Sequence, residues 1–335
     1  MSLPRTTPWA LLAAALALPA AGCGSSGART SGASAASTSP TAPAPAAPRS
    51  AGPLHVRVSA RLPAPVQLPA VTARGDTVLA IGGLDAADAS VAAIVRIRAA
   101  RAAAVGSLPR ALHDGAAATV GGASYFFGGG DAGSTSDAIL RVRPSGAATP
   151  AGTLPTGASD VEAAAIGRTA YVVGGYNGTV PLRSILAFTP GRPVQTAGRL
   201  PRPLRYAAVA AVGRLVLIAG GTSGSTARRE VLRFDPRTGV VSRIALLPAP
   251  LTHAAGAALG GRFYVLGGRG AGLDTQRAAI LAVDPSSGTV TRAGRLPVAL
   301  SDMGAASLAD RIVAVGGRDG AGRVHDEVLT LRSGV

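Results

Sequence analysis

A unit of sequence that recurs at a nearly fixed interval constrains this chain more than any local propensity. In the copy at residues 200–221, a Leu-Pro corner leads into a run of Ala and Val, a Gly-Arg turn interrupts it, and a short apolar segment ends at a Gly pair. The corners begin at Leu62, Leu108, Leu154, Leu200, Leu247 and Leu296, and the Gly pairs at Gly82, Gly128, Gly174, Gly220, Gly267 and Gly316. Six in-phase copies, 46 to 49 residues apart, predict a repeat architecture that can use the length of the chain in one closed body.

Within each unit the pattern predicts four short strands. In the copy described above, we expect them over residues 205–212, 215–219, 230–234 and 239–243. The first is rich in Ala, which favours helix and is poor in strands, but small side chains allow six such strands to converge on one axis. The turn at 235–239, Asp-Pro-Arg-Thr-Gly, places Pro at the first central position and Gly where φ is positive.

The two ends of the repeat region predict how the array closes. The last copy stops after its third strand, at residues 326–331, and a surplus strand at 54–60 precedes the first corner. We expect this surplus strand to pair with the last copy as its fourth strand, which would remove exposed sheet edges.

The period, the Gly pair and the apolar strand before it resemble the kelch repeat, whose units are the four-stranded blades of a β-propeller. The resemblance extends from residue 54 to the C-terminus, although the copies lack the Trp often found late in the kelch motif. It implies an all-β, six-bladed kelch-type propeller over residues 53–335, with four antiparallel strands per blade and the last blade closed by an N-terminal strand.

The N-terminus has the composition of an export signal. Residues 1–22 carry Arg5 and then an apolar run that is short for a membrane span. The segment Leu-Pro-Ala-Ala-Gly-Cys at 18–23 resembles the lipobox of bacterial lipoproteins, with Ala20 where Leu is commoner, and this implies cleavage before Cys23 and lipidation of it. Residues 23–52 are rich in Gly, Ser, Ala, Thr and Pro, and are predicted to be a disordered tether.

The charge of the chain is strongly positive and comes entirely from arginine. All 33 basic residues are Arg, and the formal net charge is +16. This excess reflects either a genomic preference for Arg and Ala codons or an attraction to anionic envelope polymers and lipid headgroups. Nucleic acid is not expected as a partner, because the arginines are scattered and no aromatic-interleaved basic run accompanies them.

A polar ring is predicted where each unit enters its first strand. In a four-stranded blade this position and the loop after the second strand lie on the same face, at the mouth of the central channel. The positions five and six residues after each corner Leu are Gln67/Leu68, His113/Asp114, Ser159/Asp160, Arg205/Tyr206, Thr252/His253 and Ser301/Asp302. Below them the first strands are almost all Ala, Gly and Val, with Glu162 as the one charged exception.

Two interpretations of this ring stay open. The functional one is a shallow ligand site whose carboxylates, amide and aromatic rings suit sugar hydroxyls and ring faces. Its predicted residues are Asp114, Asp160, Tyr206, His253 and Asp302, with Tyr176, Asn177, Arg269 and Arg318 from the loops after the Gly pairs. The structural one is that His113, His253 and Arg205 belong to the ordinary kelch pattern and hold blade corners together. The Gly pairs themselves are interpreted as structural.

Enzymatic alternatives find little support in the residues present. Galactose oxidase is a kelch enzyme with a copper-radical site, but here Cys23 lies in the lipobox and the four His residues fall on different parts of the blade plan. Sialic acid mutarotases of the kelch type match better in blade number and exported location. Such sugar isomerisation needs acid and base groups at the channel mouth, for which the candidates are Asp160, Glu162, His253 and Arg205. No nucleophile-elbow context for a hydrolase is present.

The sequence therefore predicts a monomeric, exported kelch propeller, lipid-anchored to the outer face of the bacterial cytoplasmic membrane. We expect it to act as a binding module of the cell envelope, with an envelope protein, a carbohydrate or a wall polymer as its partner. No cofactor or metal is predicted. The alternative is a mutarotase- or epimerase-like enzyme, which a clustering of Asp160, Glu162 and His253 in one pocket would favour over a flat, Arg-rimmed face.

Overall fold

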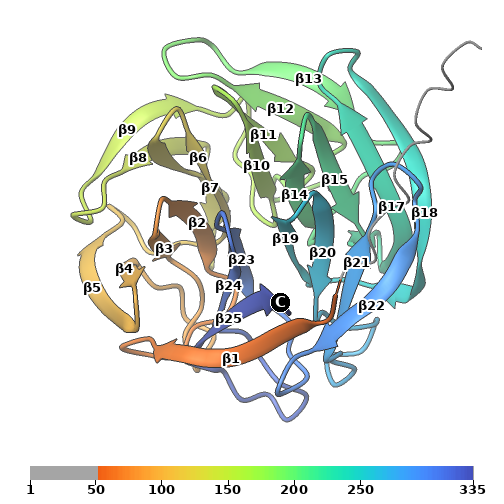
Figure 1. Cartoon of the computed structure of the whole chain (residues 1–335). Coiled ribbons are helices and arrows are strands. Elements are labelled where there is room, and N and C mark those ends of the chain that lie inside the picture. Colours follow the sequence, from red (N-terminus) through yellow and green to blue (C-terminus); the bar gives the residue numbers. More distant parts are fainter. Residues whose placement is uncertain (1–51, 335) are drawn as a thin grey trace, which may run out of the picture. The chain divides into compact units, whose positions relative to one another are not determined.

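The computed structural model describes residues 52–334, which form six antiparallel sheets arranged as blades around a central axis (Figure 1). The predicted signal at 1–22, the lipidation site Cys23 and the tether as far as residue 51 lie outside the described residues. The predicted all-β, six-bladed propeller is confirmed. No segment of the described chain forms a helix long and apolar enough to cross a membrane.

The blades follow one another along the chain. Blade 1 contains β2 (Ala70–Arg74), β3 (Thr77–Ile81), β4 (Ala93–Arg98) and β5 (Arg101–Ser107), and blade 2 contains β6 (His113–Val120), β7 (Ala123–Gly130), β8 (Ala138–Val142) and β9 (Ala148–Thr153). Blade 3 contains β10 (Glu162–Ile166), β11 (Thr169–Val173), β12 (Ser184–Phe188) and β13 (Gln195–Arg199). Blade 4 contains β14 (Ala208–Val212), β15 (Leu215–Ala219), β17 (Thr226–Asp235) and β18 (Val240–Leu251), with the short β16 (Thr222–Ser223) beside β17. Blade 5 contains β19 (Ala255–Leu259), β20 (Arg262–Leu266), β21 (Ala279–Val283) and β22 (Val290–Arg295), and blade 6 contains β23 (Gly304–Ser307), β24 (Ile312–Val315), β25 (Glu327–Ser333) and β1 (Leu54–Arg61).

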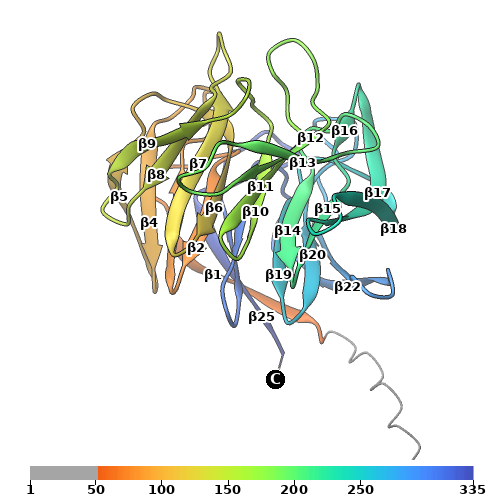
Figure 2. The ribbon, with the colours of Figure 1, turned by 90° about the horizontal axis from the view of Figure 1, so that it is seen from above.

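The Ala-rich first strands line the axis, as their composition predicts. Each packs against the first strands of the two neighbouring blades, which brings β2, β6, β10, β14, β19 and β23 together as an inner ring. Figure 2 shows several of these strands side by side, running from one face of the ring towards the other. The approach is close: a Cβ on Gly256 of β19 would lie 2.4 Å from the backbone nitrogen of Val209 in β14. Small residues are therefore a geometric requirement of the inner ring.

The first strand of blade 4 begins later than the sequence indicates. In blade 4 the predicted strand starts at residue 205, whereas β14 starts at Ala208. Tyr206, within the predicted strand, has a φ of 53°, outside the range of regular β-strands. The second strand β15 occupies the predicted residues 215–219.

Blade 6 combines the two ends of the described chain. Strand β1 pairs antiparallel with β25, with Leu54 opposite Ser333 and Arg61 opposite Glu327. Its Leu54 is buried in a hydrophobic cluster that also holds Ile280 of blade 5. The β1 side chains thus pack between blades as well as completing a sheet.

The Gly pairs join neighbouring blades through one repeated hydrogen bond. In blade 4 the Gly221 N–H donates to the Leu251 carbonyl at 2.9 Å, and Leu251 follows the next Leu-Pro corner. Gly220 has a φ of +65°, and a Cβ on it would lie 2.3 Å from that carbonyl oxygen, so only glycine fits. The same bond recurs in every blade, ending with Gly317 to Val66 between blades 6 and 1 at 2.9 Å. This confirms that the Gly pairs are structural.

The hydrophobic core lies between adjacent blades. All five Phe residues of the chain are buried there. Between blades 2 and 3, for example, Phe127 and Phe188 meet edge to face with ring centroids 5.4 Å apart, an arrangement that aromatic pairs prefer. The Phe side chains thus pack between the blades, whereas Ala and Val line the axis.

Candidate functional site

The predicted ring at the channel mouth is built on an unusual backbone conformation. The second residue of every predicted pair has a left-handed φ: Leu68 54°, Asp114 54°, Asp160 56°, Tyr206 53°, His253 55° and Asp302 61°. Such φ values are uncommon outside glycine, and Asp and His adopt them more readily than most residues. The choice of Asp in three copies therefore has a backbone reason as well as a chemical one.

The left-handed residues hydrogen-bond to one another around the axis. The Leu68 N–H donates to the Asp302 carbonyl at 2.7 Å, and the Asp302 N–H donates to the His253 carbonyl at 3.0 Å. The His253 N–H donates to Tyr206 at 3.1 Å, and the Tyr206 N–H donates to Asp160 at 3.4 Å. This chain of bonds fixes the relative positions of five blades at the mouth.

The first residue of each pair connects the ring to the loop after the Gly pair. Isolated β-bridges join Ser159 to Tyr176, Arg205 to Thr222, Thr252 to Arg269 and Ser301 to Arg318. The two classes of loop therefore lie on the same face, as predicted, and the arms Tyr176, Arg269 and Arg318 stand beside the ring.

The ring side chains close the channel instead of forming an open cup. Asp114, Asp160, Glu162, Tyr206, His253 and Asp302 all line one axial cavity, whose volume is about 30 Å³. That volume accommodates about one water molecule. Asp160 is 6% exposed and Asp302 7%. A sugar ring does not fit inside, so any larger ligand must lie on the rim above these groups.

Burial raises the pKa of several of the axial carboxyl groups. Burial in the channel raises the pKa of Glu162 to about 8. It also raises the pKa of Asp114, which the neighbouring charges of Asp160 and Asp302 raise further, and it raises the pKa of Asp302. At neutral pH, Glu162 is therefore mostly a neutral acid, consistent with the cost of ionising carboxyl groups that share a dry site.

The fourth carboxyl group, that of Asp160, is neutralised by a partner. Arg205 donates from Nε to Asp160 Oδ2 in an ion pair between blades 4 and 3. The same guanidinium donates from Nη2 to the Tyr206 hydroxyl at 3.1 Å and lies over the Tyr176 ring, 4.5 Å from its centroid. Arg205 thus joins three side chains, in line with one of the two interpretations left open for it, that of holding blade corners together.

His253 is held as a neutral ring with a defined tautomer. Its Nε2 lies 3.2 Å from Arg269 Nη2, which can only donate, so Nε2 accepts. The ring proton is then on Nδ1, which donates to Thr252 Oγ1 at 3.0 Å. Burial, together with the charges of Arg269 and Arg205, lowers the pKa of His253 to about 3. It also stacks on Tyr206, with centroids 3.8 Å apart, and has no proton to give as an imidazolium at neutral pH.

The remaining predicted residues are engaged within their own loops or with neighbouring blades. Asn177 Oδ1 accepts from the N–H groups of Thr179 and Val180 at 3.0 and 2.8 Å, so only its amide nitrogen is left for a ligand. His113 Nδ1 lies 2.9 Å from Ser90 Oγ of blade 1. Arg318 pairs with Asp88 at 3.3 Å. Within residues 52–334, no group of three or more His, Cys, Asp or Glu side chains is placed to hold a metal ion.

Sequence reasoning missed Asp88 as a member of the mouth. Its Oδ1 accepts from Gln67 Nε2 at 2.6 Å and from Arg318 Nη1 at 3.3 Å, so it bridges blades 1 and 6. The residue lies in a loop with no repeat-wide pattern, which is why the period did not indicate it. Its φ of 58° is of the kind that Asp tolerates, a weak signal that the sequence does carry.

Part of the chain matches a known protein family. The family model described as the kelch motif matches residues 203–245. This span is about one repeat unit, and it runs from just before the blade 4 ring residues Arg205 and Tyr206 into β18. No curated protein matches the chain.

Proposed function

The chain is a kelch-repeat β-propeller protein, and from that premise we propose that it is a binding module whose ligand lies on the mouth face. The observation that carries the proposal is the axial cavity of about 30 Å³. It leaves no room for a substrate among the buried acids, whereas the rim presents guanidinium, aromatic and amide groups. Recognition at a surface fits this arrangement better than chemistry in a pocket.

The rim favours an acidic carbohydrate-containing polymer as the ligand. Arg269 and Arg318 stand there with the rings of Tyr176 and Tyr206, and the Arg318 side chain is 33% exposed. Guanidinium groups recognise carboxylate and phosphate through paired hydrogen bonds, and an aromatic face suits a sugar ring. A wall polymer combines these features, and the net charge of +16 would raise its local concentration.

The proposed place of action is the outer face of the bacterial cytoplasmic membrane. The lipobox-like segment at 18–23 supports export and lipidation at Cys23. Cys23→Ser should move the full chain from the membrane to the soluble fraction of cells, because a lipid chain cannot attach to Ser. Retention of the variant in the membrane fraction would refute the anchor.

The binding proposal is tested with the full chain in detergent and purified acidic wall polymer. Arg269→Gln combined with Arg318→Gln should weaken binding by about tenfold or more, because each lost charged hydrogen bond costs of order 1.5 kcal/mol. Arg292→Gln, on outer strand β22, is the matched control and should bind as the parent does. Equal binding by all three proteins would overturn the mouth face as the site.

A mutarotase-like activity is the second candidate, and one observation favours it. Asp160, Glu162 and His253 line the same cavity, and the Glu162 pKa of about 8 is suited to proton transfer near neutral pH. The test uses NMR to measure the rate at which sugar anomers interconvert in the presence of the full chain or of its Glu162→Gln variant. A rate equal to the uncatalysed one with the parent protein would remove this candidate.

A further inference from the structure

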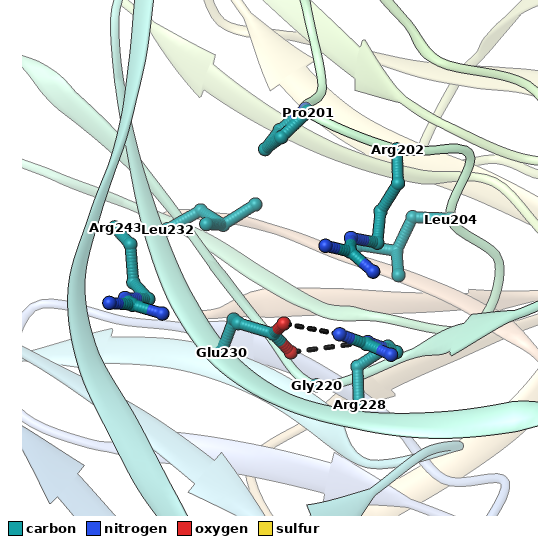
Figure 3. A pocket seen from close by; sticks show the side chains of 8 residues that line it. All are labelled: Pro201, Arg202, Leu204, Gly220, Arg228, Glu230, Leu232 and Arg243. Atoms are coloured by element: carbon teal, nitrogen blue, oxygen red, sulfur yellow. Dashed lines mark hydrogen bonds and ion pairs between the residues drawn. The ribbon is translucent and has the colours of Figure 1, made fainter.

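A second concavity lies on the outer part of blade 4, beneath the corner that leads from blade 3 (Figure 3). Its volume is about 320 Å³, within the range of small-molecule sites. It shares no lining residue with the axial cavity. Its polar walls are Arg202, Arg228, Glu230 and Arg243, and its apolar surface includes Leu204 and Leu232.

The charges of this blade 4 pocket are not balanced. Arg228 donates to both carboxylate oxygens of Glu230, and these bonds lower the pKa of Glu230 to about 2, so this pair is already satisfied. Arg202 and Arg243 have no hydrogen bond or ion pair within residues 52–334, and Figure 3 shows them on opposite sides of the pocket. Two guanidinium groups therefore remain available to a ligand.

Four positions in the repeat carry the charged residues of the blade 4 pocket. The first is the second residue after the corner Leu, and the second is the residue whose N–H donates to the carbonyl of the second Gly. The third lies two residues further on, and the fourth is the outer-strand partner of Leu232 or its equivalent. Only blade 4 has charged residues at all four of these pocket positions, as the strand register shows. Blades 1 and 3 have no charged residue at any of the four. Blade 5 keeps Arg277 and Arg292 but has Ala249 and Ala279 at the other two. The repeat itself does not require these charges.

Blade 5 also shows what the same place looks like without the counterparts of Arg202 and Glu230. A concavity of about 290 Å³ lies there, lined by the equivalent residues, including Arg277, Ala279 and Arg292. Since the two pockets are nearly equal in size and both contain the inner and outer arginines, Arg202 and Glu230 are what distinguish blade 4. This gives the chain an internal control for any ligand of the blade 4 pocket.

We propose that the blade 4 pocket binds a small organic acid with two negative charges on an apolar frame. Arg202 and Arg243 pair with the two acidic groups, and Leu204 and Leu232, both buried in the protein, contact the frame. Glu230 keeps Arg228 in place and repels a ligand that carries a third acidic group near it. Charged hydrogen bonds of this kind are strong and geometrically specific, and the proposal is independent of the function proposed for the mouth face.

The test is calorimetric titration of the full chain in detergent with glutarate, adipate and isophthalate as probes. At least one of these dianions should bind, and its matched monoacid, butyrate, hexanoate or benzoate, should bind at least about tenfold more weakly. Arg202→Gln and Arg243→Gln should each weaken dianion binding at least tenfold. Both side chains are exposed, so the variants should keep the parent melting temperature.

The matched control is Arg292→Gln, at the blade 5 position equivalent to Arg243. It should leave dianion affinity unchanged. An equal loss in this control would show attraction to the overall positive charge and would overturn the pocket. The absence of binding by all three dianions, or unchanged affinity in both blade 4 variants, would overturn it as well.

Discussion

The charged side chains of the axial cavity and those of the blade 4 pocket differ in whether they have partners within the protein. On the axis, acids from several blades lie together, where Glu162 keeps its proton at neutral pH and Asp160 is paired with Arg205. In blade 4, two arginines face a concavity with no partner in the described chain. Polar residues gathered at a propeller axis can thus be fully occupied in holding the ring together, whereas a pocket that departs from the repeat keeps groups free for a ligand.

The largest expected effect comes from a change that should remove both regions at once. Deleting residues 53–61 takes away β1, leaving β25 without its partner and removing Leu54 from the cluster between blades 5 and 6. We expect the propeller to lose cooperative unfolding, measured by circular dichroism and calorimetry of the full chain carrying the deletion. A soluble deletion variant with a sharp melting transition would show that closure through β1 is dispensable.

The next largest effect is a difference in unfolding free energy between a variant at the axial cavity and a variant at the blade 4 pocket. Arg205→Ala leaves the buried Asp160 carboxylate without its partner, which should reduce the free energy of unfolding by about 3 kcal/mol. Arg202→Ala, in the exposed wall of the blade 4 pocket, should change it by less than about 0.5 kcal/mol. Urea unfolding at pH 7 measures both. Similar losses in the two variants would erase the distinction between a structural and an available arginine.

Glu162 should make the protein less stable as the pH rises. Its pKa is about 8 in the folded protein against 4.5 for the free side chain, so the unfolded chain releases this proton first. The cost grows from about pH 4.5 and levels off above about pH 8. Glu162→Gln should therefore add of order 2 kcal/mol at pH 7 and flatten the profile, as measured by urea unfolding from pH 5 to 8.5. A pH-independent difference between the two proteins would contradict the burial of an ionisable Glu162.

Glu230 should show the smallest effect, with the opposite sign. Its pKa is about 2 against 4.5 for the free side chain, so its ion pair with Arg228 contributes stability that is present above about pH 4.5. That contribution is lost as the pH falls through about 2. Glu230→Gln should cost about 1 kcal/mol at pH 7, because solvent screens a side chain that is partly exposed. The measurement is the difference in unfolding free energy at pH 7 and pH 3, which should shrink at the lower pH.

The ring residues illustrate how far the sequence alone could define the candidate site. The offset from each corner Leu correctly placed Asp160, Tyr206 and His253 on one face, because a repeat fixes which residues share a level. It did not reveal the left-handed φ of the same positions, nor that these side chains line a cavity of only about 30 Å³. Both features depend on how closely six inner strands approach one another.

The blade 4 pocket lay beyond sequence reasoning for a related reason. Arg202 follows a corner, Arg228 and Glu230 lie on β17, and Arg243 lies on β18. Each is an ordinary arginine or glutamate in a chain rich in arginine, and no spacing rule joins them. Only the strand register and the path of the corner over the blade bring them to one concavity.

The sequence by itself determined the period, the strand order and the glycine positions, because these follow from local patterns repeated in phase. The tertiary structure decided which polar groups are free. Whether a charge is neutralised depends on its neighbours across blades, as with Arg205 and Asp160, and such neighbours are set by ring closure, which no single repeat encodes.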